Sequence, residues 1–157
     1  MSDAGVKALR SVLRENEQFT VSEGLKSRCA KSIRGLGYRS QFIRDFNTCT
    51  EILGHFSAIA GTPLGQHDMT MNMSHTNFGE IGADQPVDTW HIDSVPYVCV
   101  LLLSDATDMV GGELQVAMLG DPTEAIDRVR VGDIKPSDIE MVNYPGPGYC
   151  IFMQGSR

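Results

Sequence analysis

Apolar side chains recur at every third or fourth position through the first third of the chain, which is the spacing of one face of an α-helix. Three helices are therefore expected there. Their apolar faces are, in chain order, Val6, Leu9 and Leu13; then Leu25, Cys29, Ile33 and Leu36; then Phe42, Phe46, Cys49, Leu53, Phe56 and Ala60. The second helix should follow Ser22, and the third should end at Gly61, because Pro63 cannot continue a helix.

After Pro63 the chain becomes a series of short extended runs separated by Gly, Pro and Asp, a pattern typical of strands. The strands expected are 67–78, 89–103, 113–118 and 149–153, and residues 97–103, apolar on both faces, predict a strand buried between layers. Residues 119–148 are polar and rich in Asp, Pro and Gly, which indicates a long surface loop. The pattern predicts one α+β domain over 1–157, with a helical part at 1–63 and a strand-rich part at 64–157.

Composition narrows the classes of function. The chain has 157 residues, and its hydrophobic fraction of 41% is enough for one buried core. A net charge of -7 argues against nucleic-acid binding, which needs a basic surface. The longest apolar run, Val95 to Leu103, is far shorter than the roughly 20 residues that cross a bilayer, and no apolar signal core is present. We therefore expect a cytoplasmic protein that binds neither membranes nor nucleic acid.

The four cysteines, Cys29, Cys49, Cys99 and Cys150, include no C-x-x-C pair and each lies in an apolar context. This pattern favours buried free thiols over a disulfide or a zinc site.

His91 and Asp93 are the candidate site. Residues two apart on a strand point to the same face, so the strand expected at 89–103 would bring this imidazole and this carboxylate together. The two groups supply two corners of the 2-His-1-carboxylate triad that binds non-haem Fe(II). The alternative is a hydrogen-bonded polar pair at the end of a strand. Glu113 follows two glycines and is expected near solvent.

The segments around this pair resemble the Fe(II)/2-oxoglutarate-dependent oxygenase superfamily, particularly its phytanoyl-CoA-hydroxylase-like and prolyl-hydroxylase-like branches. The resemblance covers about residues 66–157. It rests on Trp90-His91-Ile92-Asp93-Ser94, the strand from Tyr97 to Leu103, Gly111-Gly112-Glu113-Leu114, and the run from Gly148 to Ser156. It implies that the N-terminal helices pack on a double-stranded β-helix, or jelly roll. It also implies that His91 and Asp93 bind Fe(II), and that Asn72, Leu114 and Gln115 line the pocket of the cosubstrate 2-oxoglutarate.

The resemblance is incomplete at its C-terminal end. The family's distal histidine and the basic residue for the cosubstrate lie beyond the strand that matches Tyr149 to Gln154, and the chain has neither position. His75 is a weaker candidate for the third ligand, and His55 and His67 are weaker still. We therefore expect a jelly roll truncated at its C-terminus, with the third ligand beyond Arg157 or in another chain.

The function that this resemblance implies is hydroxylation, or a related oxidation, of a small-molecule substrate by an Fe(II)- and 2-oxoglutarate-dependent dioxygenase. The expected loop at 119–148 would help to exclude water. The unpaired strand edges of a truncated barrel predict a homo-oligomer or a complementing chain. The alternative is an inactive jelly-roll fragment or pseudoenzyme that binds a ligand or a partner; a cupin-like protein with another metal is a third class.

Overall fold

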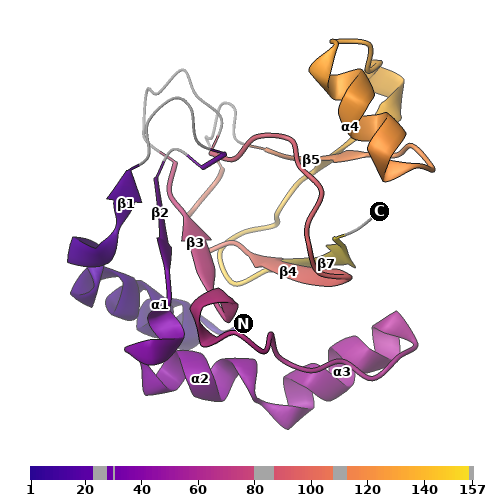
Figure 1. The fold of residues 1–157 in the computed structure, drawn as a ribbon. Helices are drawn as coiled ribbons and strands as arrows, with labels where there is room; N and C mark the ends of the chain where they lie inside the picture. Colours follow the sequence, from indigo (N-terminus) through magenta and orange to yellow (C-terminus); the bar gives the residue numbers. More distant parts are fainter. Residues whose placement is uncertain (23–27, 30, 80–86, 108–112, 156–157) are drawn as a thin grey trace. The chain divides into compact units, whose positions relative to one another are not determined.

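The computed structural model describes residues 1–22, 28–29, 31–79, 87–107 and 113–155. The chain folds into two compact units. The first contains residues 1–6 and 88–157, and the second contains residues 7–87. Each unit combines helices with short antiparallel strands, so the α+β class is confirmed (Figure 1). The jelly roll and the single domain over 1–157 stay predictions.

The helices of the second unit follow the predicted apolar pattern in part. Helix α1 (Asp3–Glu15), whose first residues belong to the first unit, buries Val6 and Leu9 as expected. The long helix expected from Phe42 to Ala60 is instead two helices, α2 (Gln41–Asn47) and α3 (Thr50–Ala60).

The break between α2 and α3 has a local cause. The Asn47 amide and the Thr48 hydroxyl donate hydrogen bonds to the carbonyl oxygens of Ile43 and Arg44, four residues earlier, at 2.8 and 2.9 Å. Polar side chains that bond to nearby backbone groups weaken a helix interior. Helix α3 then ends at Gly61, as predicted, and this glycine takes the left-handed φ of 67°.

A three-stranded antiparallel sheet occupies the place of the predicted second helix. Its strands are β1 (Val21–Ser22), β2 (Lys31–Arg34) and β3 (His75–Asn77), in that order. The helix expected after Ser22 is therefore wrong; its residue Leu25 lies outside the described residues. Ile33 is buried at the centre of β2, where it pairs with Thr76, more than forty residues later. Spacing within a short window cannot reveal such a distant partner.

The described part of the second unit also contains short 3-10 helices: η1 (Glu17–Phe19), η3 (Leu36–Tyr38) and η4 (Thr70–Asn72). Leu36, the last apolar residue of the expected second helix, is buried in η3. The strand expected over 67–78 is correct only at β3, because η4 occupies its first half.

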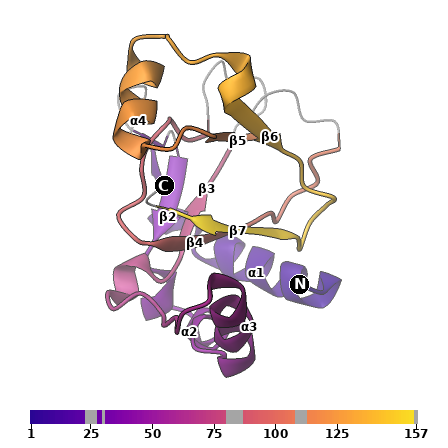
Figure 2. The ribbon, with the colours of Figure 1, turned by 90° about the vertical axis from the view of Figure 1, so that its right-hand side faces the viewer.

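The described residues of the first unit form two separate two-stranded antiparallel sheets (Figure 2). One pairs β4 (Tyr97–Leu101) with β7 (Cys150–Gln154), and the other pairs β5 (Leu114–Ala117) with β6 (Ile139–Val142). The strands expected at 97–103, 113–118 and 149–153 are thus confirmed. Burial of β4 on both faces is not, since Cys99 and Val100 are exposed.

The long loop expected over 119–148 is also wrong, because this segment contains helix α4 (Pro122–Arg130), the short helix η5 (Pro136–Asp138) and β6. The sequence does carry the start signal of α4. The Asp121 carboxylate caps the helix by accepting hydrogen bonds from the backbone N–H groups of Thr123 and Glu124, at 2.8 and 3.1 Å. Pro122 occupies the first turn, where its missing N–H is not needed.

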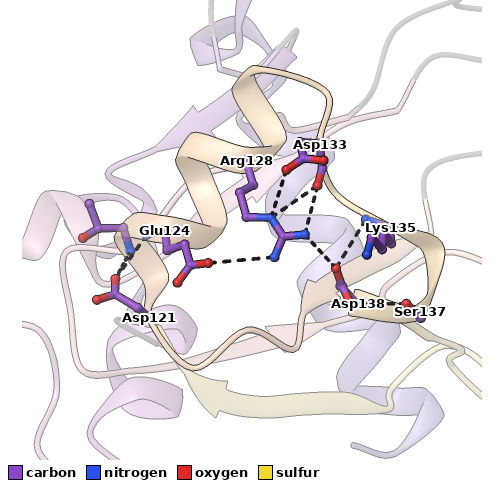
Figure 3. Close-up of polar contacts among 8 residues, drawn as sticks. Asp121, Glu124, Arg128, Asp133, Lys135, Ser137 and Asp138 are labelled. Atoms are coloured by element: carbon purple, nitrogen blue, oxygen red, sulfur yellow. Dashed lines mark hydrogen bonds and ion pairs between the residues drawn. The ribbon is translucent and has the colours of Figure 1, made fainter.

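Arg128 connects α4 to the segment that follows it (Figure 3). Its guanidinium donates hydrogen bonds to the Asp133 carbonyl oxygen and to the Asp138 carboxylate, at 3.1 and 3.2 Å from Nη2. Glu124 lies at the edge of the cluster, 3.9 Å from Nη1. The planar guanidinium can serve several acceptors at once, which a lysine cannot do in the same geometry.

Replacing Arg128 by methionine is expected to lower the free energy of unfolding by about 1–2 kcal/mol, because its hydrogen bonds to Asp133 and Asp138 are lost while the aliphatic stem is retained. Arg130→Met is the matched control: Arg130 is 71% exposed and pairs with Asp127 alone among the described contacts, so its loss should cost less than about 0.5 kcal/mol. Urea unfolding followed by circular dichroism measures both. Equal effects of the two variants would contradict the role given to Arg128.

Among the described residues, none of the four cysteines is in a disulfide, but only Cys29 is buried. Cys49 is half-buried, and Cys99 and Cys150 are exposed, so the prediction of buried thiols is correct for one residue of the four. Among the described residues, no helix is long and apolar enough to cross a membrane.

Candidate functional site

The structure brings His91 and Asp93 together, although not in the way that their spacing predicts. Both residues lie in the irregular segment before β4, which begins only at Tyr97, so the strand expected from Thr89 is wrong over its first half. Even so, the His91 Nε2 atom lies 3.2 Å from Asp93 Oδ1. The two side chains are 28% and 24% exposed, which leaves the pair accessible to a small ligand.

Backbone pairing beyond the end of the β4 and β7 strands holds Asp93 in place. The Asp93 N–H donates to the carbonyl oxygen of Gly155 at 2.8 Å, and the Gly155 N–H donates to the carbonyl oxygen of Pro96 at 2.9 Å. These bonds extend the contact between the two chain segments past the last paired residues, Tyr97 and Gln154. Gly155 is buried, and a Cβ atom there would lie 2.8 Å from Asp93 Cβ. Only a glycine fits this approach without displacement.

The other ring nitrogen of His91 has its own acceptors. Nδ1 lies 2.6 Å from the carbonyl oxygen of Thr89 and 3.6 Å from Oδ1 of Asp88. Because a carbonyl oxygen can only accept, Nδ1 carries a proton and donates it. In a neutral imidazole, the lone pair is then on Nε2, the atom that faces Asp93.

This arrangement places a nitrogen lone pair 3.2 Å from a carboxylate oxygen. Two electron-rich atoms at this distance repel unless a proton or a cation lies beside both. A proton on Nε2 gives an imidazolium that donates a hydrogen bond to Asp93. A divalent cation with both atoms as adjacent ligands at about 2.1 Å and a right angle would separate them by about 3.0 Å. The observed distance fits both cases.

A third ligand is not beside the pair among the residues that the structure describes, where no group of three or more His, Cys, Asp and Glu side chains could hold a metal. Asp88 approaches Nδ1 and therefore supports the ring from the side opposite to Nε2. The three remaining histidines, His55, His67 and His75, belong to the second unit.

The residues predicted for the cosubstrate lie on other elements. Leu114 and Gln115 are on β5, in the first unit, opposite Val142 and Met141. Asn72 ends η4 in the second unit, where its Oδ1 accepts a hydrogen bond from Arg34 Nη1 at 3.3 Å. Their roles stay predictions. Of the motifs behind the resemblance, Gly111, Gly112 and Ser156 lie outside the described residues.

The first unit also contains an open pocket that sequence reasoning missed. Six residues line it: Ala106, Thr107, Glu113, Val142, Asn143 and Tyr144. Burial, followed by the negative charge of the Cys99 and Cys150 thiolates, raises the pKa of Tyr144 to about 12. Its hydroxyl therefore keeps its proton at a higher pH than an ordinary tyrosine does. Asn143 and Tyr144 directly follow β6. Recognition of that strand in the sequence would therefore have indicated where these two pocket residues lie.

No family model, curated protein or solved structure matches the chain. The resemblance to the oxygenase superfamily therefore rests only on the residues quoted for it.

Proposed function

We propose that His91 and Asp93 are two ligands of an Fe(II) centre, and that the chain belongs to a 2-oxoglutarate-dependent dioxygenase that hydroxylates a small molecule. The observation that carries this proposal is the 3.2 Å approach of His91 Nε2 to Asp93 Oδ1, with Nδ1 held by the Thr89 carbonyl. A metal-binding histidine usually donates its second N–H to a carbonyl or a carboxylate, which fixes the tautomer and the orientation of the ring.

Each part of the site then has a defined task. The Thr89 carbonyl oxygen accepts the hydrogen bond from Nδ1, which keeps Nε2 available as a ligand, and the Asp88 carboxylate lies 3.6 Å from Nδ1. The backbone bonds between Asp93 and Gly155 fix the carboxylate. Bound Fe(II), together with 2-oxoglutarate and oxygen, supplies the oxidising chemistry.

The remaining parts of the proposal are the cosubstrate pocket and the third ligand. Leu114 and Gln115 are proposed to line the pocket, within a jelly roll, and Asn72 stays a predicted pocket residue. The third ligand is proposed to come from a residue that the described structure does not place beside the pair, in this chain or in a complementing one.

Anaerobic titration with Fe(II) tests the two assigned ligands. The unmodified chain should bind Fe(II), and His91→Ala and Asp93→Ala should each weaken binding by about tenfold or more, since even the loss of a group that only supports a ligand costs 10–100-fold. His55→Ala is the control, because His55 is exposed on α3 and should leave the affinity unchanged. Addition of 2-oxoglutarate should give a weak visible charge-transfer band only where the full ligand set assembles.

Fe(II) affinities that these substitutions leave unchanged would favour a different function. Unchanged affinity in both His91→Ala and Asp93→Ala would refute the iron centre, and loss of binding in His75→Ala alone would move the site to that residue. The alternative function is then favoured: a binding module without metal, in which His91 and Asp93 form a hydrogen-bonded imidazolium and carboxylate. In that case the two variants would lower stability and leave metal binding unaffected.

A further inference from the structure

Two cysteines lie on one face of the sheet that β4 and β7 form. The register places Cys150 opposite Leu101, and Cys99 opposite Phe152. Since alternate residues of a strand share a face, Cys99 and Leu101 point the same way, as do Cys150 and Phe152. The two cysteines are therefore diagonal neighbours across the pair of strands. The stacked rings of Tyr97 and Phe152, with centroids 5.5 Å apart, lie next to them on the same face.

The Cys150 thiol lies near enough to raise the pKa of Cys99, and neither of these exposed cysteines is in a disulfide. Diagonal positions on an antiparallel pair are about 7–8 Å apart, with the Cβ atoms somewhat closer. This is longer than the Cα separation of about 4.4–6.8 Å that a disulfide spans, so the two strands must move closer together for the bond to form. Because this sheet has only two described strands, a small increase in their twist can bring the two cysteines within range.

The pKa of one thiol of the pair is raised. Partial burial of its side chain, then the negative charge of the Cys150 thiolate, then a hydrogen bond to Cys150, raises the pKa of Cys99 to about 12. At neutral pH the thiolate fraction of Cys99 is therefore smaller than that of an ordinary cysteine, which makes it a poorer nucleophile. It can still act second, since an attack within one chain needs only a small fraction of thiolate.

We propose that Cys99 and Cys150 form a redox-active dithiol, which a low-molecular-weight disulfide oxidises to an intrachain bond between β4 and β7. The Cys150 thiolate attacks one sulfur of the small disulfide, which forms a mixed disulfide and releases one small thiolate. Cys99 then loses its proton and attacks the Cys150 sulfur, which releases the second small thiolate. The protein loses two electrons and two protons, and the small disulfide is reduced to two thiols.

A disulfide between β4 and β7 would lie near the backbone hydrogen bonds that hold Asp93. Tyr97, at the start of β4, and Gln154, at the end of β7, are the paired residues nearest to the backbone bonds of Asp93. A covalent link between the same two strands restricts their separation. The dithiol does not depend on the proposed iron centre, and it is tested without metal.

Incubation of the reduced protein with oxidised glutathione, followed by intact mass measurement and peptide mapping, tests the dithiol. The expected product has lost two hydrogen atoms and contains a Cys99 to Cys150 cross-linked peptide. Cys99→Ser should stop at a mixed disulfide on Cys150, and Cys150→Ser should form no intrachain bond. Cys49→Ser, which alters a thiol bonded to Glu51 in the second unit, should oxidise as the unmodified chain does. Mixed disulfides alone, or a bond that does not include both residues, would overturn the proposal.

The pH dependence of ring closure provides a second test. In the mixed disulfide on Cys150 the charge of the Cys150 thiolate is absent, and partial burial still raises the pKa of Cys99. The rate of closure should therefore rise with pH between about pH 7 and 9, by up to about tenfold per pH unit, since the thiolate fraction grows at that rate below the pKa. A closure rate that is independent of pH would show that Cys99 is not the attacking thiol.

Discussion

Gly155→Ala is expected to destabilise the first unit by about 1–3 kcal/mol, the cost of forcing an extra carbon into a packed place. The added Cβ would lie 2.6 Å from the carbonyl oxygen of Val95 and 2.8 Å from Asp93 Cβ. Neither neighbour is the flexible end of a side chain, so the backbone must move. Fluorescence of the single tryptophan, Trp90, during urea unfolding reports on this unit.

The same substitution should weaken the proposed metal site. Asp93 is held by the backbone bond to Gly155, so a displaced backbone moves the carboxylate away from His91 Nε2. Fe(II) affinity should fall together with stability, even though glycine is not a ligand. Gly120→Ala is the matched control in the same unit, because a Cβ there meets no atom within 4 Å. A Gly155→Ala protein as stable as the Gly120→Ala protein would contradict the close approach.

Ile33→Ala should destabilise the second unit by about 2–5 kcal/mol, the range for truncating a fully buried isoleucine. Ile33 is only 1% exposed and is central in β2, between the two outer strands of its sheet. Removal of its side chain leaves a cavity that the short strands cannot fill. The ellipticity at 222 nm during urea unfolding reports mainly on this unit, because α2, α3 and most of α1 belong to it.

Two further substitutions test whether the loss of stability depends on the size and burial of the side chain that is removed. Ile33→Val removes one methylene group and should cost about 0.5–1.5 kcal/mol. Val21→Ala alters a residue of β1 that is 51% exposed, and should change stability by less than about 0.5 kcal/mol. If Ile33→Ala cost no more than Val21→Ala, burial at the centre of β2 would not be the source of stability in this unit.

Local signals predicted several elements correctly. The spacing of Val6 and Leu9 gave α1, Gly61 gave the end of α3, and short apolar runs gave β4, β5 and β7. Each of these signals lies within a few residues of the structure that it specifies. The start signal of α4, Asp121 followed by Pro122 and Glu124, was equally local and was missed because the surrounding segment is polar.

The prediction of a helix after Ser22 failed for a different reason. Ile33 and Leu36 have helical spacing, yet one is in a strand and the other is in a 3-10 helix. Two apolar residues three apart are compatible with several local structures, and pairing with His75–Asn77 selects the strand. Tertiary contacts commonly override a weak local preference in this way.

The sequence by itself determined the elements with local signals and the chemical identity of the candidate groups, an imidazole and a carboxylate two residues apart. Only the tertiary structure decided how those groups meet, through the Thr89 carbonyl at the ring and Gly155 at the carboxylate. It also decided that Cys99 and Cys150 are neighbours, since their contact follows from the register of two strands about fifty residues apart. Periodicity reflects neighbours along the chain, whereas strand register depends on packing between distant segments, which no short stretch of sequence encodes.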